Sequence, residues 1–283
     1  MKIGFIGLGI MGESMALNII KKHGDAVHVY DIDKAKMEQL AAAGGIAADN
    51  PLELAAASDL IISMVPTSKH SQAVYDGILD AIDPSKICID MSTIEPSVSR
   101  AIAAKVGEKG AAFLDAPVVK SKPAAIAGQL GIYVGGDRAV FEKVKPILLY
   151  MGANVIHLGG NGMGLVMKIA HNTLVAQIQN GVNEMLSFAG AYGIGIDDFV
   201  AAVSYGGAQN FYLDSKNKAI KERNFTTAFS VENMHKDVTI GCDMLRESGL
   251  ERRGMALVKD VYDQAMARGF GKEDFSATYK LFG

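Results

Sequence analysis

The chain opens with Lys2-Ile3-Gly4-Phe5-Ile6-Gly7-Leu8-Gly9-Ile10-Met11-Gly12, a short apolar run followed directly by a G-x-G-x-x-G pattern. We expect a strand, a tight turn and then a helix, whose first N–H groups would face phosphates. Gly7 permits the tight exit from the strand, Gly9 leaves room for backbone to approach a pyrophosphate, and Gly12 lets the helix pack closely on the sheet. The cofactor contacts predicted for this turn are Gly7, Leu8, Gly9, Ile10, Met11 and Gly12.

The residues after the turn strengthen the case for a dinucleotide. A G-x-G-x-x-G pattern alone is weak, because the 31 glycines of the chain make chance matches easy. Here a second strand is predicted over residues 26–30, and Asp31 follows it, about twenty residues past the turn, where a carboxylate can accept both ribose hydroxyls. The alternative is a surface turn residue before Asp33. A carboxylate would repel a 2′-phosphate, and no arginine follows in Ile32-Asp33-Lys34, so the sequence favours NAD over NADP.

Composition and length suit a two-domain enzyme that acts on small molecules. The chain has 283 residues, more than a typical single domain, and its 49% hydrophobic content suffices for sizeable cores. Its net charge of −3 provides neither the basic surface that nucleic acid requires nor a polybasic membrane anchor. We therefore expect no nucleic acid and no membrane among the partners, but small molecules and further copies of the chain.

The cysteines and the apolar runs bear on the cellular compartment. Cys88, in a predicted strand, and Cys242, in a predicted helix, are too few for a disulfide framework and lack the spacing of metal ligands. We expect buried thiols, no metal and a cytoplasmic location. The first apolar stretch is interrupted by glycines, unlike a signal peptide, and no apolar run approaches the length of a membrane span.

The periodicity of apolar residues changes near residue 160. Before it, short β-rich runs alternate with helical patterns, which predicts an α/β domain with a Rossmann-like, doubly wound, mostly parallel sheet. The later strands are expected at residues 60–65, 87–91, 112–114, 132–134 and 155–158. One long helix to about Tyr192 is then predicted by apolar residues four positions apart, Val166, Ala170, Leu174 and Ile178. We expect a NAD-binding domain over residues 1–160 and an all-helical domain over residues 161–283.

Two loops at strand ends are expected to form a wall of the cofactor site. Met64-Val65-Pro66-Thr67-Ser68 follows one strand and Asp90-Met91-Ser92-Thr93 follows the next, at the carboxyl edge where open α/β sheets bind ligands. Taken singly, Pro66 is explained as a turn former and Thr93 as a helix cap. Their positions at consecutive strand ends favour cofactor contacts from Val65, Pro66 and Thr93.

A second group of candidate residues lies in the long helix. Lys168 and Asn172 are four residues apart and share one face, with His171 beside them. A helical lysine is usually a solvated cation, but Lys168 follows the domain joint, where a cleft between the domains is expected. Partial desolvation and the positive nicotinamide would disfavour its ammonium form there and favour acid–base catalysis. His171 is the alternative base, and Asn172 would orient the substrate or the amine.

With these residues assembled, the chain resembles the β-hydroxyacid dehydrogenase (3-hydroxyisobutyrate dehydrogenase-like) family from Lys2 to about Tyr279. The resemblance rests on the glycine turn, the Asp115-Ala116-Pro117-Val118 loop closed by Gly128, the Gly162-x-Gly164-x3-Lys168-x3-Asn172 helix and His235-Lys236-Asp237. It implies a Rossmann-like domain, a helical domain for substrate binding and oligomerisation, a homodimer or homotetramer, and Lys168 as the catalytic acid/base. It also implies that Thr93 and Lys236 approach the nicotinamide half of the cofactor, with the Pro66 loop nearer the adenosine.

The reaction implied by the resemblance is hydride transfer between a nicotinamide cofactor and the oxygen-bearing carbon of a small β-hydroxy acid or related anionic alcohol. Lys168 would accept the hydroxyl proton in oxidation or donate a proton to the carbonyl in reduction. A non-catalytic NAD-binding protein could dispense with this lysine, and an imine reductase typically has another residue there. The presence of both Lys168 and Asn172 argues against these alternatives.

The loop after Asp115 departs from the family pattern. Relatives commonly read Asp-Ala-Pro-Val-Ser-Gly-Gly, whereas this chain has Val119-Lys120-Ser121 in place of Ser-Gly-Gly. Val119 thus replaces the serine that helps hold a substrate carboxylate, while Ser121 could still donate to the substrate. Lys120 either points to water with Lys122 or pairs with an anionic head such as sulfonate, phosphonate or carboxylate. The sulfolactaldehyde reductases of this family likewise carry a cation there.

The helical domain is expected to add to the substrate pocket. The glycine-broken stretch from Ser204 to Tyr212 falls between predicted helices, and the resemblance places it near the substrate. Asn210 is the polar contact that we expect there. The alternative is an interhelical turn whose aromatic residues pack in the core.

Overall fold

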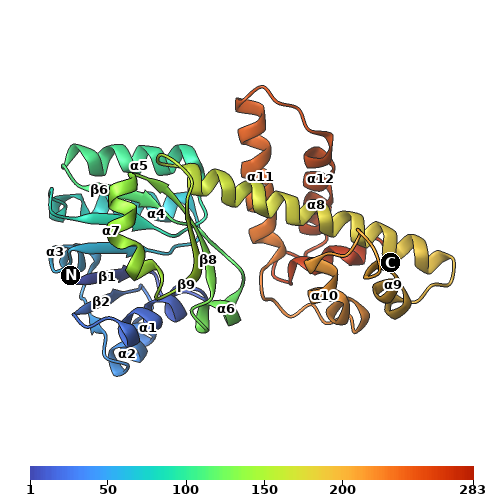
Figure 1. Ribbon diagram of the computed structural model, residues 1–283, viewed down its shortest axis with the longest axis horizontal. Helices are drawn as coiled ribbons and strands as arrows, with labels where there is room; N and C mark the ends of the chain where they lie inside the picture. Colours follow the sequence, from blue (N-terminus) through green and yellow to red (C-terminus); the bar gives the residue numbers. More distant parts are fainter. The chain divides into compact units, whose positions relative to one another are not determined.

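The computed structural model describes residues 1–283, which form two compact units, Met1–Lys168 and Ile169–Gly283. The first unit has an α/β fold and the second is all-helical (Figure 1). The fold class predicted from the sequence is therefore confirmed. The two units divide within one long helix, somewhat beyond the boundary expected at residue 160.

The first unit is built on a nine-stranded sheet in the order β3-β2-β1-β4-β5-β6-β8-β7, with β9 paired to β8. Strands β1 to β6 are parallel to one another, whereas β8 runs antiparallel to β6 and β7. The strands are β1 Ile3–Ile6, β2 Val27–Tyr30, β3 Ile46–Ala47, β4 Leu60–Ser63, β5 Ile87–Asp90, β6 Ala112–Asp115, β7 Val118–Val119, β8 Leu130–Gly136 and β9 Gly152–His157.

Helices cover both faces of this sheet, as expected of a doubly wound fold. Ile3 and Phe5 of β1 pack in a buried cluster that includes residues of α1, α2, α6 and α7. Ile6, on the opposite face, belongs to a cluster that includes residues of α3, α4 and α5. Burial on both faces explains why the central strands β1 and β4 are buried at every position rather than at alternate ones. The helices are α1 Gly12–Lys22, α2 Lys34–Ala42, α3 Pro51–Ala56, α4 Ser68–Ile78, η1 Leu79–Ala81, α5 Pro96–Glu108, α6 Lys122–Ile126 and α7 Arg138–Leu148.

The second unit is organised around α8 (Met163–Ala191), which begins in the first unit and has 29 residues. The polar residues of α8 that are buried here have partners within the unit. Tyr212 donates to Asn183 Oδ1 at 3.2 Å, and Tyr262 donates to Gln179. Despite the length of α8, no helix combines the length and hydropathy needed to cross a membrane. The remaining elements are α9 Ile196–Val203, α10 Phe211–Lys221, α11 Val231–Glu247, α12 Arg253–Ala267 and η2 Phe275–Leu281.

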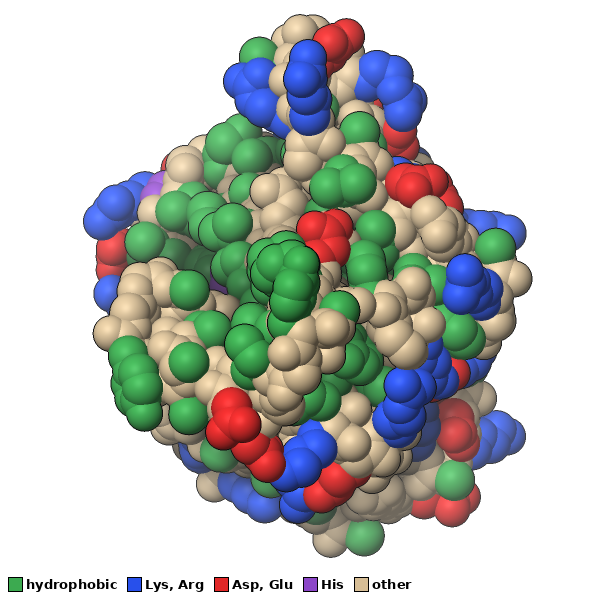
Figure 2. Space-filling view, turned by 90° about the vertical axis from the view of Figure 1, so that its right-hand side faces the viewer, with side chains coloured by type: hydrophobic (Ala, Val, Ile, Leu, Met, Phe, Trp, Pro, Cys, Tyr) green, Lys and Arg blue, Asp and Glu red, His purple; other side chains and the backbone are tan.

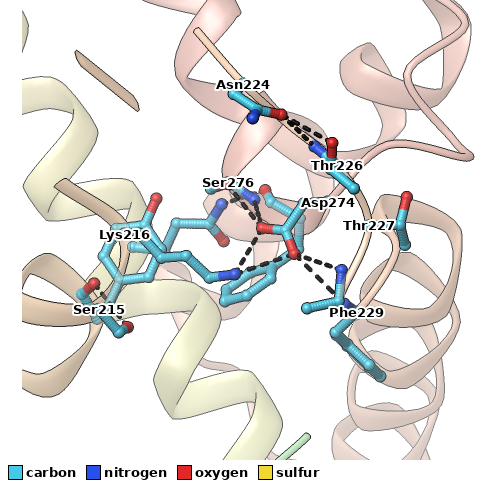
Figure 3. Close-up of polar contacts among 12 residues, drawn as sticks. Ser215, Lys216, Asn224, Thr226, Thr227, Phe229, Asp274 and Ser276 are labelled. Atoms are coloured by element: carbon cyan, nitrogen blue, oxygen red, sulfur yellow. Dashed lines mark hydrogen bonds and ion pairs between the residues drawn. The ribbon is translucent and has the colours of Figure 1, made fainter. Parts of the chain in front are cut away.

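A buried carboxylate, Asp274, joins three parts of the second unit (Figure 3). Lys216 of α10 approaches its Oδ1 at 2.9 Å, and the backbone N–H groups of Ala228 and Phe229 donate to Oδ2 at 3.1 and 3.3 Å. Ser276 donates to Oδ1 from both its N–H and its hydroxyl. Burial alone would raise the pKa of Asp274, but these hydrogen bonds and Lys216 outweigh it and lower the pKa from 3.8. Asp274 thus fixes the loop before α11 and the start of η2 to α10.

Candidate active site

The carboxyl ends of the parallel strands lie in one row. In the registers, Ile6 pairs with Tyr30 and Ser63, Ser63 pairs with Asp90, and Asp90 pairs with Asp115. The residues that follow each strand therefore collect at one edge of the sheet. Strand β1 lies between β2 and β4, so the chain order reverses at this point, which is where doubly wound sheets bind ligands.

The three glycines of the opening turn have different surroundings. Gly7 has a φ of +95°, and a Cβ added to it would lie 2.3 Å from the carbonyl oxygen of Met64. A Cβ on Gly12 would lie 2.0 Å from the carbonyl oxygen of Gly7, whereas one on Gly9 would meet nothing within 4 Å. Packing of the chain thus requires glycine at Gly7 and Gly12, while Gly9 borders open space.

Open space at Gly9 and the start of α1 together fit a dinucleotide phosphate. Helix α1 begins at Gly12, and no side chain caps its N-terminus. The uncapped N–H groups and the positive end of the helix dipole favour an anion at this position. In the same turn Ile10 is 66% exposed, whereas Leu8 is buried.

Asp31, directly after β2, is tied to the glycine turn. Its Oδ2 accepts from the N–H of Leu8 at 2.5 Å, and its Oδ1 accepts from the N–H of Asp33 at 2.9 Å. These bonds hold a carboxylate beside the turn, at the place that a ribose occupies in dinucleotide-binding folds.

Asp90, fully buried at the end of β5, connects the loops that follow β4 and β5. Its Oδ1 accepts from the Ser63 hydroxyl and from the N–H of Ser92, each at 3.0 Å. The Ser92 hydroxyl in turn accepts from the N–H of Val65 at 2.8 Å. Burial raises the pKa of Asp90, although the hydrogen bonds from Ser92 and Ser63 oppose the shift. The loops that carry Pro66 and Thr93 are therefore fixed from beneath by a carboxylate.

Asp115, at the end of β6, caps the first turn of α8. Its carboxylate accepts from the N–H of Gly162 at 2.6 Å and from the N–H of Leu165 at 3.0 Å. Gly162 has a φ of +92°, and a Cβ on Gly164 would lie 2.4 Å from the carbonyl oxygen of Tyr133 and 2.9 Å from Asp115 Oδ2. The Gly162-x-Gly164 pattern is thus explained by the left-handed backbone at Gly162 and by the close approach of the helix to Tyr133 of β8 and to this carboxylate at Gly164. Burial raises the pKa of Asp115, and both backbone hydrogen bonds oppose the shift.

Lys168 and Asn172 follow the capped turn along α8, and both are largely buried, at 7% and 6% exposure. Asn172 donates its side-chain amide to Asp237 Oδ2 at 2.6 Å, which fixes the orientation of the amide. Asp237, on α11, is 1% exposed, and the distance from its Oδ1 to the Nζ of Lys236 is 3.4 Å. Asp237 Oδ1 accepts no hydrogen bond. The second unit thus contains a cluster of the buried Asn172 and Asp237 with the partly exposed Lys236. The sequence predicted Asn172 and Lys236, but not Asp237, as site residues.

The comparisons with known proteins agree over nearly the whole chain. A model described as the NAD binding domain of 6-phosphogluconate dehydrogenase matches residues 2–159, and one described as NAD-binding of NADP-dependent 3-hydroxyisobutyrate dehydrogenase matches residues 162–282. A 2-(hydroxymethyl)glutarate dehydrogenase from Eubacterium barkeri is 32% identical, covering 99% of this chain and 94% of the relative. An NAD-dependent L-serine dehydrogenase from Pseudomonas aeruginosa is 33% identical, covering 99% and 97%. The chain belongs to the β-hydroxyacid dehydrogenase family.

A solved structure supports the same assignment for this β-hydroxyacid dehydrogenase. The 3-hydroxyisobutyrate dehydrogenase of Mycobacterium tuberculosis with L-serine is 27% identical, with a TM-score of 0.91, and the match covers 99% of this chain and 98% of that one. The relatives are named as dehydrogenases, so the protein is an oxidoreductase with NAD(P)-binding domains. The predicted enzyme class and family are confirmed.

The loop after Asp115 of this β-hydroxyacid dehydrogenase has an unusual backbone. Lys120 has a φ of 79°, a left-handed conformation that favours glycine, and it is exposed. Val119 before it is buried, and Ser121 occupies the position before α6 without a side-chain cap hydrogen bond. The substitution of glycine by lysine noted in the sequence therefore falls at a position whose conformation still suits glycine.

Other residues near the predicted site have partners in the helical unit. Asn210 caps α10: its Oδ1 accepts from the N–H of Leu213 at 2.8 Å, and its amide nitrogen donates to the carbonyl of Ala208 at 3.0 Å. Its predicted contact with substrate stays a prediction that these bonds do not support. The Nε2 of His235 lies 2.6 Å from the Oδ1 of Asp263.

Proposed function

We propose that this protein is an NAD-dependent dehydrogenase that interconverts a small β-hydroxy acid, or a related anionic alcohol, and the corresponding aldehyde or ketone, with Lys168 as the acid/base. The observation that carries the proposal is the pairing of Lys168 with Asn172, one turn apart on α8 and both buried. Each end of this segment is fixed by a carboxylate, since Asp115 caps the helix and Asp237 holds Asn172. A lysine that is merely solvated needs no such support.

The names of the relatives support the substrate class. 2-(Hydroxymethyl)glutarate, L-serine and 3-hydroxyisobutyrate each have a hydroxymethyl group on the carbon that bears a carboxylate. We infer that this protein accepts a substrate with the same arrangement: a primary alcohol, or its aldehyde, next to a carbon that bears an anionic group.

In the proposed reaction, Lys168 removes the proton of the substrate hydroxyl during oxidation and returns it to the carbonyl oxygen during reduction. Asn172, whose amide is oriented by Asp237, positions the substrate by hydrogen bonding. A bound nicotinamide nucleotide would supply or accept the hydride. The turn of Gly7, Gly9 and Gly12, with Asp31 and the Val65, Pro66 and Thr93 loops, would hold that nucleotide, and Lys236 would approach its nicotinamide half.

Asp31 supports NAD as the preferred nucleotide. A carboxylate at this position accepts the ribose hydroxyls and repels a 2′-phosphate. The residues after it, Ile32-Asp33-Lys34, contain no arginine to pair with such a phosphate.

Lys120 supports an anionic head group in the substrate. Its left-handed backbone is costly for a lysine, and strained residues that persist often serve a binding site. A cation in place of the first loop glycine of relatives suits a sulfonate or phosphonate as well as a carboxylate. Reduction of a short sulfonated or phosphonated aldehyde is therefore the second candidate activity, with Ser121 and the backbone at Val119 as further contacts.

Replacing Lys168 by alanine tests the proposed function. Turnover should fall by about 10²–10⁴-fold, the usual contribution of a general acid–base group, while the dissociation constant for NADH stays unchanged. The substrate panel should pair short hydroxy acids with sulfonated and phosphonated analogues.

The matched control is Lys86→Met. Lys86 is a similarly buried lysine, which donates to the carbonyl oxygens of Ala55 and Ser58 and has no part in the proposed site. Its loss should lower stability but leave the kcat of folded protein unchanged. Wild-type turnover in Lys168→Ala would exclude the lysine as acid/base.

A further inference from the structure

A network of buried polar groups lies beneath the loops that follow β4 and β5. The charged side chains of this protein are mostly at its surface, as Figure 2 shows for the face that it views. Asp90 is an exception at 1% exposure, and it accepts from the hydroxyl of Ser63 and from the N–H of Ser92, which are buried as well. The hydroxyl of Tyr75, on α4, lies 2.9 Å from that of Ser63. A hydrogen-bonded network of this kind holds its surroundings in one arrangement.

The two loops also exchange hydrogen bonds with each other. The N–H of Val65, in the loop after β4, donates to the hydroxyl of Ser92, in the loop after β5, at 2.8 Å. In the opposite direction, the N–H of Glu95, directly before α5, donates at 3.1 Å to the hydroxyl of Ser68, the first residue of α4. We define these two bonds as the serine clasp. Each loop contributes one backbone donor and one serine acceptor to it.

The clasp lies on both sides of the proposed nucleotide contacts. Along the chain, Pro66 falls between the two clasp residues of the first loop, and Thr93 falls between the two of the second. The loops are thus joined both before and after these two residues. Because a loop held at two points has little freedom between them, the clasp fixes the separation of Pro66 and Thr93.

We propose that Ser68 and Ser92 are positioning residues for the nicotinamide half of the nucleotide, which hold Thr93 at a set distance from the loop of Pro66. Each serine acts through the backbone N–H that it binds and need not touch the nucleotide. This inference rests on the proposed function, in which Thr93 approaches the nicotinamide half and the Pro66 loop lies nearer the adenosine. The adenosine half, held by Asp31 and the glycine turn, should bind without the clasp.

The buried network strengthens the clasp at Ser92. Burial raises the pKa of Asp90, and hydrogen bonds from the hydroxyl and the N–H of Ser92 oppose the rise. A hydroxyl that donates to a carboxylate becomes a better acceptor for a further donor, here the N–H of Val65. Ser68, in contrast, is only partly buried. We therefore expect the larger effect from the loss of Ser92.

Ser92→Ala tests the clasp, because it removes the acceptor of the Val65 N–H. The Kd for NADH should rise about tenfold, which corresponds to the loss of one hydrogen bond. The Kd for ADP, which lacks the nicotinamide riboside, should stay unchanged. Isothermal titration calorimetry of the folded variant measures both constants. Amide hydrogen exchange in the nucleotide-free protein provides a second readout, since exchange at Val65 should become faster.

Ser68→Ala provides an independent and milder test, because its position is partly exposed. It should raise the Kd for NADH by a smaller factor than Ser92→Ala, again without changing the Kd for ADP. Two bonds that act as one clasp are coupled, so the double variant should weaken NADH binding by less than the product of the two single effects.

The matched control is Ser58→Ala. Ser58 is as buried as Ser92 and donates its hydroxyl to the carbonyl oxygen of Leu54 at 2.7 Å, but it precedes β4 and lies away from the proposed site. Its loss should lower the stability of the first unit and leave both dissociation constants unchanged. This control separates a positioning role from a general loss of stability.

Thr93→Gln distinguishes failure of the clasp from failure of the proposed site. A larger side chain at Thr93 should obstruct the nicotinamide half, so an unchanged Kd for NADH in this variant would overturn both proposals. A raised Kd in Thr93→Gln together with an unchanged one in Ser92→Ala and Ser68→Ala would overturn the clasp alone. Equal weakening of NADH and ADP in the serine variants, or full multiplication of their effects in the double variant, would also overturn it.

Discussion

At the scale of single residues, the proposed choice of nucleotide and substrate depends on two positions, Asp31 and Lys120. In the proposed site Asp31 would lie where the nucleotides NAD and NADP differ, and its carboxylate is fixed by the N–H groups of Leu8 and Asp33. Lys120 lies in the loop after Asp115, which we propose to contact the substrate, and has a φ of 79°, which costs an L-residue about 1–2 kcal/mol relative to right-handed backbone. Both are single side chains whose charge can be removed without disturbing a core.

Asp31→Ser should change the preference between the two nucleotides. Loss of the carboxylate removes hydrogen bonds to the ribose and the repulsion of a 2′-phosphate, each worth about a factor of ten or more. The ratio of kcat/KM for NAD to that for NADP should fall by about 100-fold. Asp33→Asn is the control, because Asp33 caps α2 through the N–H of Ala35 and asparagine also caps helices. A ratio unchanged in Asp31→Ser would contradict the role of Asp31.

Lys120→Gly should separate stability from binding. Glycine adopts the left-handed backbone freely, so the free energy of unfolding should rise by up to about 1 kcal/mol in urea titrations. The KM for an anionic substrate should rise about tenfold or more, since a charge-assisted hydrogen bond is lost, while that for an uncharged analogue stays constant. Lys122→Ala, which removes a neighbouring exposed cation, should change neither value. An equal effect on charged and uncharged substrates would reject the anion contact.

At the scale of helices and strands, the sequence predicted elements with a strong local signal. The helix expected after the glycine turn is observed at Gly12–Lys22, and the long helix expected to end near Tyr192 ends at Ala191. Strand β7 was not predicted, because its two residues are too few to show periodicity. The antiparallel direction of β8 was not predicted either, since apolar content does not encode strand direction.

The candidate site was predictable where its residues follow one another and was missed where distant segments meet. The glycine turn and the Lys168–Asn172 spacing can be read along the chain. The cap that Asp115 provides to α8 joins residues 47 positions apart, and the bond from Asn172 to Asp237 joins residues 65 positions apart. No local pattern reports such a contact. The family resemblance includes two motifs that contain these aspartates, Asp115-Ala116-Pro117-Val118 and His235-Lys236-Asp237. Such motifs mark the positions of the aspartates in the sequence but do not show which groups they bind.

Asp115→Asn should weaken the start of α8 and, with it, catalysis. An asparagine has one acceptor oxygen, so one of the N–H groups of Gly162 and Leu165 would face an NH2 group instead. Leaving such a buried donor unpaired costs about 1–3 kcal/mol of stability. We expect kcat to fall while NADH affinity is retained, because Lys168 follows the loosened turn.

The control for this variant is Asp137→Asn. Asp137 caps α7 through the N–H of Val140 at 2.9 Å, and it is exposed, so asparagine can serve there at little cost. Urea titrations compare the free energies of unfolding of the two variants, and steady-state kinetics compare their kcat values. Equal kcat in the two variants would show that the cap of α8 does not position the catalytic lysine.

At the scale of the whole molecule, the two units should respond in opposite directions to acid. In the first unit, burial raises the pKa values of Asp90 and Asp115 above 3.8. As the pH falls, these two carboxylates therefore take up protons in the folded state before they do so in the unfolded state. Their contribution to stability therefore increases as pH falls toward 3.8. In the second unit the pKa of Asp274 lies below 3.8, so its contribution is present above that value and is lost as pH falls through the folded pKa.

Hydrogen exchange followed unit by unit between pH 5 and pH 3 checks this expectation, after correction for intrinsic exchange rates. The second unit should lose protection before the first. Asp274→Asn should destabilise the second unit by about 3 kcal/mol at neutral pH, because Lys216 loses its buried partner. The variant should also reduce the acid sensitivity of that unit. Simultaneous loss of protection in both units of the wild type would contradict the assignment to these carboxylates.

The cap on α8 also affects the order of events during synthesis. Gly162 follows Asp115 by 47 residues. A ribosome that adds about 5–20 residues per second makes Gly162 roughly 2–10 s after Asp115. Until then the carboxylate has no helix to cap and stays hydrated. A nascent chain therefore completes this buried part of its nucleotide-binding unit only when the helix leading into the second unit emerges, which couples the end of folding of one unit to the translation of the next.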